Sequence, residues 1–93
     1  MSFSRKGSFI ESSEGFSIEE LGREGIRYHE RSHALYVWTE FLMPQGTAVS
    51  TRGMTRWDPP NDQELIDPTQ KERILHNIKE AIEYEGETVT FVS

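Results

Sequence analysis

The sequence predicts an α+β domain in which an antiparallel β-meander is covered on one face by one C-terminal helix and followed by a final short strand. Three observations support this prediction. Residues 67–86 have caps at both ends and apolar positions at helical spacing, the first half is rich in β-forming residues, and the run ETVTFV follows the helix. The 93 residues, 34% hydrophobic and 28% charged, are enough for a single domain over residues 1–93 with one core.

The clearest element is a helix over residues 68–85. Asp67 is a good N-cap, Pro68 takes the first helical position, and Gln70 completes a capping box, while Gly86 is a natural stop. One stripe of the helix is expected to face the core and contains Ile74, Leu75, Ile78, Ala81 and Ile82. The opposite, charged face contains Glu72, Arg73, Lys79, Glu80 and Glu83.

The segments GIRYHE and HALYVWTEFL are predicted to pair as a hairpin around Arg31 and Ser32. Tyr28 then lies opposite Leu35 and Ile26 lies opposite Val37, which makes one side of the ribbon apolar. Arg-Ser is a poor sequence for a two-residue type I′ or II′ turn, so a longer loop with a bulge is the alternative. The PQG sequence at residues 44–46 predicts the next reversal, and TAVSTRGM predicts a third strand. GSFIES and GFSIEEL are either short strands or a strand and a turn.

The stretch TRWDPPND connects the meander to the helix. Each proline disfavours helical backbone at the residue before it, so Asp58 and Pro59 are expected to be extended. In one interpretation Trp57 plugs the end of the core and the prolines form a rigid linker. In the other, a stiff acidic loop with an aromatic anchor forms a contact surface that loses little entropy on binding. Both can hold at once.

The charge distribution bears on the class of partner. Residues 1–57 carry equal numbers of acidic and basic side chains, so the net charge of −6 arises entirely after Trp57. Such a surface disfavours nucleic acid and attracts a basic protein, although acidic surfaces also serve solubility alone. The chain has no cysteine, no signal-peptide pattern and no apolar run of membrane-spanning length, so a cytoplasmic protein without membrane contact is expected.

Several features together resemble a family of predicted immunity proteins from bacterial polymorphic toxin systems. They are RWDPPND, the helix ERILHNIKEAIEYEG that follows it, the last strand, and the earlier hairpin IRYHERSHALYV. The resemblance spans about residues 25–92 and leaves residues 1–24 uncovered; the hairpin loop HERSH departs from the glycine and aspartate usual in the family. It implies a small α+β protein that binds and neutralises a cognate toxin domain encoded by a neighbouring gene, without catalysis.

The expected toxin-binding surface is the acidic loop with the helix face next to it, or the exposed face of the hairpin. The candidate residues are Trp57, Asp58, Asp62, Glu64, Tyr36 and Trp38. The alternative function is a small acidic interaction or regulatory module, homodimeric through an exposed edge strand. A weaker alternative takes the Pro-Pro pair as a ligand for an aromatic groove.

The sequence does not favour catalysis, a metal or a cofactor. It has no cysteine nucleophile, no G-x-S-x-G elbow and no glycine-rich phosphate loop. His29 and His33 are predicted to lie on opposite faces of the hairpin, which does not suit a shared metal. Asp58, Asp62 and Glu64 lack the glycine of a calcium loop. We therefore expect a protein that is not an enzyme.

Overall fold

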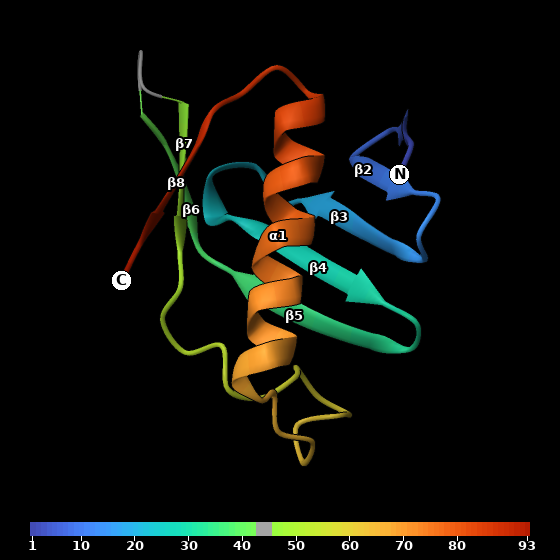
Figure 1. Cartoon of the computed structure of the whole chain (residues 1–93), viewed down its shortest axis with the longest axis vertical. Coiled ribbons are helices and arrows are strands. Elements are labelled where there is room, and N and C mark those ends of the chain that lie inside the picture. Colours follow the sequence, from blue (N-terminus) through green and yellow to red (C-terminus); the bar gives the residue numbers. More distant parts are fainter. Residues whose placement is uncertain (43–45) are drawn as a thin grey trace.

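The computed structural model describes residues 1–42 and 46–93, which form two β-sheets and one long helix (Figure 1). In chain order the elements are β1 (Phe3–Lys6), β2 (Phe9–Ser12), β3 (Phe16–Glu20), the 3₁₀ helix η1 (Gly22–Glu24), β4 (Ile26–Glu30), β5 (His33–Val37), β6 (Thr39–Leu42), β7 (Gly46–Ser50), α1 (Pro68–Tyr84) and β8 (Val89–Val92). The predicted α+β class is confirmed. The reversal predicted around Pro44 lies outside the described residues.

The first sheet is an antiparallel meander of the order β1-β2-β3-β4-β5. The predicted hairpin register is confirmed, with Ile26 opposite Val37 and Tyr28 opposite Leu35. Its loop is the short one, because Glu30 and His33 are still paired. Arg31 has a φ of 57°, so it adopts the left-handed conformation for which such turns prefer glycine. The segments GSFIES and GFSIEEL, left open between strands and turns, form β2 and β3, and β1 precedes them as a strand that was not predicted.

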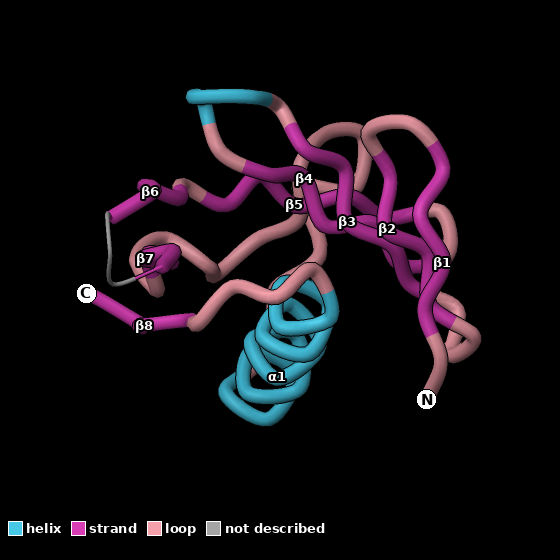
Figure 2. Tube along the Cα trace, turned by 90° about the horizontal axis from the view of Figure 1, so that it is seen from above, coloured by secondary structure: helices cyan, strands magenta, loops and turns pink. Residues whose placement is uncertain are grey.

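The helix α1 covers one face of the five-stranded sheet, as Figure 2 shows from above. Its N-terminus has the predicted capping box, in which Asp67 Oδ1 accepts from the Gln70 amide at 2.8 Å and Gln70 Oε1 accepts from the Asp67 amide at 3.0 Å. On its buried stripe Ile74, Ile78 and Ala81 are fully enclosed. The stripe packs on apolar side chains that share one face of the meander: Ile10, Phe16, Ile18, Ile26, Tyr28, Leu35 and Val37.

One feature of the predicted meander is wrong: HALYVWTEFL is not one strand. It divides at Trp38 into β5, the last strand of the first sheet, and β6, the first strand of a second sheet of the order β6-β7-β8. The division occurs because the pairing with β4 ends at Val37, and the Trp38 carbonyl accepts instead from the Ser50 amide at 2.9 Å. Trp38 is therefore the junction between the two sheets.

The final strand β8 lies parallel to β7, with Thr47 opposite Val89 and Val49 opposite Phe91. Parallel neighbours require a long crossover, which the loop after β7 and the helix α1 supply. Met54, Trp57 and Ile66 anchor that loop because their side chains are buried in the core. The connection between the sheets is therefore itself part of the core.

Candidate functional site

The acidic loop is closed by backbone contacts between its two ends. The Ile66 amide donates to the Thr55 carbonyl at 2.8 Å, and Arg56 and Leu65 form an isolated antiparallel bridge. Inside the loop, the Asn61 amide donates to the Asp58 carbonyl at 3.0 Å. These bonds fix the backbone of the loop.

Trp57 lies in the core and only 5% of it is exposed. Its indole stacks on Tyr28 with ring centroids 6.5 Å apart and meets the edge of His33 at 5.1 Å. The next residue follows the outer edge of β5, where the Asp58 amide donates to the Ala34 carbonyl at 2.8 Å. Trp57 thus plugs the core, as one of the two interpretations predicted, and its indole supports the loop from beneath.

The three acidic side chains of the loop have different environments. Asp58 Oδ2 lies 3.9 Å from Nε of Arg27, and Glu64 Oε2 lies 2.9 Å from Nε2 of His33. Asp62 is exposed and its carboxylate makes no ion pair with any residue in the described ranges. The loop therefore holds two tethered carboxylates and one free one at the edge of the first sheet.

Tyr36 lies on the face of β5 that points away from α1, and Trp38 follows at the junction of the sheets; 41% and 44% of their surfaces are exposed. Tyr36 is the register partner of Arg27, the residue that contacts Asp58. The Tyr36 hydroxyl donates to the Glu24 carbonyl, so η1 holds the ring in place. The hairpin face and the acidic loop, proposed from the sequence as alternatives, are thus adjacent in the fold.

We call this area the β5 surface, and define it by Arg27, Tyr36, Trp38, Asp58, Asp62 and Glu64. The Tyr36 ring and the Arg27 guanidinium group lie on the outer face of the meander, with the half-exposed Trp38 beside them. The loop carboxylates lie along the edge of β5, where Asp58 contacts Arg27 and Glu64 contacts His33, a residue of the α1-facing side. Of the sequence candidates, only Trp57 does not contribute a surface side chain. Arg27 was missed, although its place opposite Tyr36 in the predicted register could have identified it.

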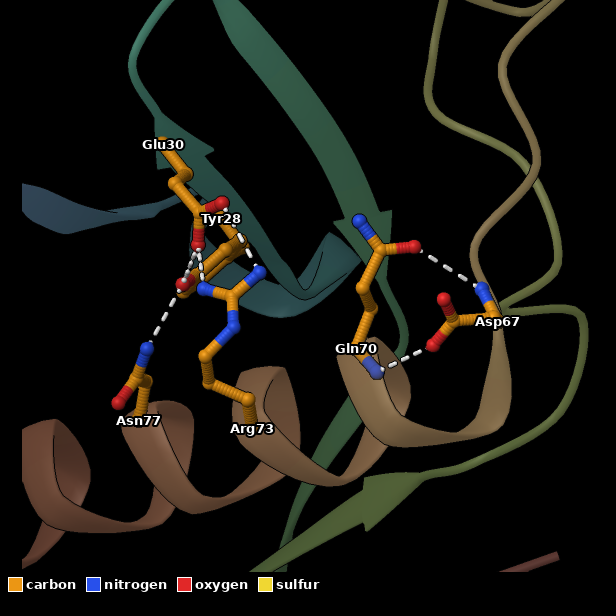
Figure 3. A network of polar contacts seen from close by, with 6 residues as sticks. All are labelled: Tyr28, Glu30, Asp67, Gln70, Arg73 and Asn77. Carbon is orange, nitrogen blue, oxygen red and sulfur yellow. Dashed lines mark hydrogen bonds and ion pairs between the residues drawn. The ribbon is translucent and has the colours of Figure 1, made fainter.

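A polar network between α1 and β4, which runs from the buried Asn77 to the exposed Arg73, was also missed (Figure 3). Asn77 Nδ2 donates to the Tyr28 hydroxyl at 2.9 Å, and that hydroxyl donates to Glu30 Oε1 at 2.7 Å. Arg73 binds both carboxylate oxygens of Glu30, with Nη2 at 3.1 Å from Oε2. The sequence signal was Asn77, a polar residue within the apolar stripe. The network joins α1 to β4, so the helix and the hairpin hold each other in register.

The network also shifts the ionisation of its members. Burial raises the pKa of the Tyr28 hydroxyl, which stays protonated and acts as a donor. For Glu30, burial acts to raise the pKa, but the hydrogen bonds from Arg73 and Tyr28 outweigh it and hold the pKa below its ordinary value. The Glu30 carboxylate is therefore charged and paired, which suits a structural contact.

The outer face of the meander carries a second set of polar contacts. His29 Nε2 lies 3.0 Å from Glu19 Oε1, and the same oxygen is 3.5 Å from Arg27 Nη1. The hydrogen bond with His29 is the main cause that lowers the pKa of Glu19. As the register predicts, His29 and His33 are on opposite faces. Within residues 1–42 and 46–93, no three histidine, aspartate or glutamate side chains gather as a metal site would require.

No helix in the described part of the chain is long and apolar enough to cross a membrane. Searches among curated proteins and among solved structures gave no match. A family model described as immunity protein 74 matches residues 18–92, which extends the resemblance seen in the sequence into β3. Because the match spans most of the chain and both sheets, the chain belongs to the immunity protein 74 family.

Proposed function

We propose that this protein binds and neutralises a cognate toxin domain of a bacterial polymorphic toxin system, and that it does so without catalysis. Family membership supports the general role, and the β5 surface is the observation that supports the mode of action. The toxin is encoded by a neighbouring gene, and the two proteins meet in the cytoplasm. No cofactor takes part.

The β5 surface suits a binder because its parts are held before association. The loop ends are paired, Trp57 is locked in the core, and Tyr36 is tied to η1. A surface fixed in this way loses little conformational entropy when it binds, so more of the interaction energy appears as affinity. Half-exposed aromatic rings such as Tyr36 and Trp38 are frequent anchors at protein interfaces.

The charge of the surface indicates the chemistry of the partner. Three carboxylates and two guanidinium groups, those of Arg27 and Arg56, lie in this area, and the whole chain carries a net charge of −6. A basic patch on the toxin would be steered toward this side, which raises the association rate at low salt. The expected partner therefore presents lysine and arginine side chains around an apolar centre.

The test is a triple variant, Asp58→Asn with Asp62→Asn and Glu64→Gln, which keeps the shape of the loop and removes three charges. Co-expressed with the toxin from the neighbouring gene, it should fold normally yet protect cells less well than the parent. Stopped-flow association should be slower, by about tenfold at low salt, with a shallower salt dependence, because steering is weakened.

A matched control separates the β5 surface from net charge. Glu14→Gln with Glu80→Gln and Glu83→Gln also removes three charges, from places outside this surface. This control should keep near-parental protection and salt dependence. If both triples behave alike, the β5 surface has no special part in binding. If the parent neither binds nor protects against the toxin, the proposed immunity function is wrong.

One observation favours the second candidate, a homodimeric interaction module. β8 is an edge strand of the second sheet, and Phe91 and Val92 are 38% and 37% exposed there. An edge strand with exposed apolar side chains can pair with a symmetry mate. Sedimentation equilibrium at micromolar concentration distinguishes the two: a dimer that Phe91→Lys dissociates supports the module, and a monomer excludes this pairing.

A further inference from the structure

A cleft of about 1060 Å³ opens between the two sheets and has no role in the function proposed above. Buried isoleucines from three strands and the helix line it: Ile10, Ile18, Ile26 and Ile82. Its walls come from separate elements, with Arg5 on β1, Trp38 at the sheet junction and Thr47 on β7. The cleft is therefore an apolar hollow with a polar rim.

One side of the rim already holds a cation of the chain itself. Arg5 Nη2 lies 2.5 Å from Glu20 Oε1, and Arg5 Nη1 lies 2.7 Å from Glu85 Oε1. The guanidinium group of Arg5 thus spans two carboxylates at this side of the cleft. A long cationic side chain of the chain itself is therefore held at this part of the rim.

Another carboxylate that lines the cleft, that of Glu87, has no cationic partner among the described residues. Glu87 Oε1 accepts from the Thr47 hydroxyl at 3.3 Å, and no ion pair joins Glu87 to a described residue. Thr47 is the register partner of Phe41, so the Phe41 ring lies on the same face of the second sheet. Phe41 is 59% exposed, and Trp38 is 44% exposed where the cleft meets the β5 surface.

Arg23, on η1, also lines the cleft, so its positive charge must be counted before the charge of the ligand is inferred. Four carboxylates and two guanidinium groups line the cleft, and one guanidinium group, that of Arg5, is held by two of those carboxylates. The other two carboxylates, those of Glu40 and Glu87, outnumber the one remaining cation, Arg23. The cleft therefore favours a cationic ligand over an anionic one. The two exposed rings favour a ligand with an apolar stem, since arginine and lysine pack their stems on aromatic faces.

We propose that this cleft receives one arginine or lysine side chain of the toxin, with its stem against Phe41 and Trp38 and its charged end at Glu87. This inference rests on the proposed immunity function and adds a second, deeper contact to it. The site is continuous with the β5 surface through Trp38, so one toxin face can reach both. The ligand chemistry is a long cationic side chain on a folded protein.

The experiment measures binding of the purified toxin domain to four variants. Phe41→Ala and Glu87→Gln alter the cleft, whereas Tyr84→Ala and Glu83→Gln make the same kinds of change at exposed positions that do not line it. The two cleft variants should each weaken the equilibrium affinity by about tenfold, mainly through faster dissociation, because they remove contacts made in the complex. The two controls should stay within about twofold, and thermal melts check that all four are folded.

A double-mutant cycle identifies the cationic side chain. Each surface arginine and lysine of the toxin is changed to alanine and measured against the parent and against Glu87→Gln. One toxin residue should lose its effect in the Glu87→Gln background, which is the signature of a direct pair. If the parent binds and the cleft variants bind equally well, the cleft proposal is wrong and the immunity function stands. If the parent does not bind, both are wrong.

Discussion

The hydroxyl of Tyr28 offers the sharpest test of how α1 is fixed to the meander. Tyr28→Phe removes a single oxygen from a fully buried ring, so its shape is kept. Asn77 Nδ2 then loses its acceptor at 2.9 Å and Glu30 loses a donor at 2.7 Å. Leaving a buried polar group unpaired costs about 1–3 kcal/mol. We expect about 2 kcal/mol, because Glu30 keeps Arg73 as a partner whereas Asn77 is left alone.

For a domain of this size about 2 kcal/mol lowers the melting temperature by roughly 10 °C, which far-UV circular dichroism measures easily. Tyr84→Phe is the control, since that ring is 48% exposed and removal of its hydroxyl should change little. Adding Asn77→Leu to Tyr28→Phe should restore part of the loss, because both polar partners are then gone. A Tyr28→Phe melt within about 2 °C of the parent would refute the stabilising role of the network.

Three further predictions concern the helix and the pH dependence. Ile78→Asp should unfold the domain, because an unpaired charge replaces a fully buried side chain, and cooperative melting near the parental temperature would contradict the packing. Asp67→Ala should lower the free energy of unfolding in urea by about 0.5–2 kcal/mol through loss of the capping box, whereas Asp62→Ala, outside any cap, should not. Burial acts to raise the pKa of Glu30, but Arg73 and Tyr28 hold it below 4.5, so its stabilisation is complete above pH 4.5 and is lost as the pH falls through the lowered pKa. Urea titrations between pH 7 and 3 should therefore show a shallower acid loss for Glu30→Gln than for the parent, and parallel curves would contradict this assignment.

Local patterns predicted much of this fold. The helix followed from its caps and stripe, and the hairpin register followed from the loop at Arg31 because a shift of one residue would have turned Tyr28 and Leu35 to solvent. The division at Trp38 was not predictable in this way, since β-forming residues continue without a break on both sides of it. The first sheet ends where the backbone after Val37 stops pairing with β4 and pairs with β7 instead.

The parallel position of β8 had a signal that sequence reasoning did not use. A strand, a helix and a strand in succession favour parallel neighbours, and residues 46–92 follow that order. For the candidate site, sequence found both the acidic loop and the aromatic residues of the hairpin. It could not show that they adjoin, because their contact passes through Arg27, a residue distant from Asp58 in the chain.

The hydrogen bond from the Asp58 amide to Ala34 has a consequence for how β5 can be recognised. It occupies a main-chain acceptor on the outer edge of the strand, and the next two residues, Pro59 and Pro60, have no amide hydrogen to offer. An incoming strand therefore cannot extend the ladder at Ala34. A protein that docks at this position contacts side chains instead of backbone, which favours selectivity for one partner and hinders polymerisation through this part of β5.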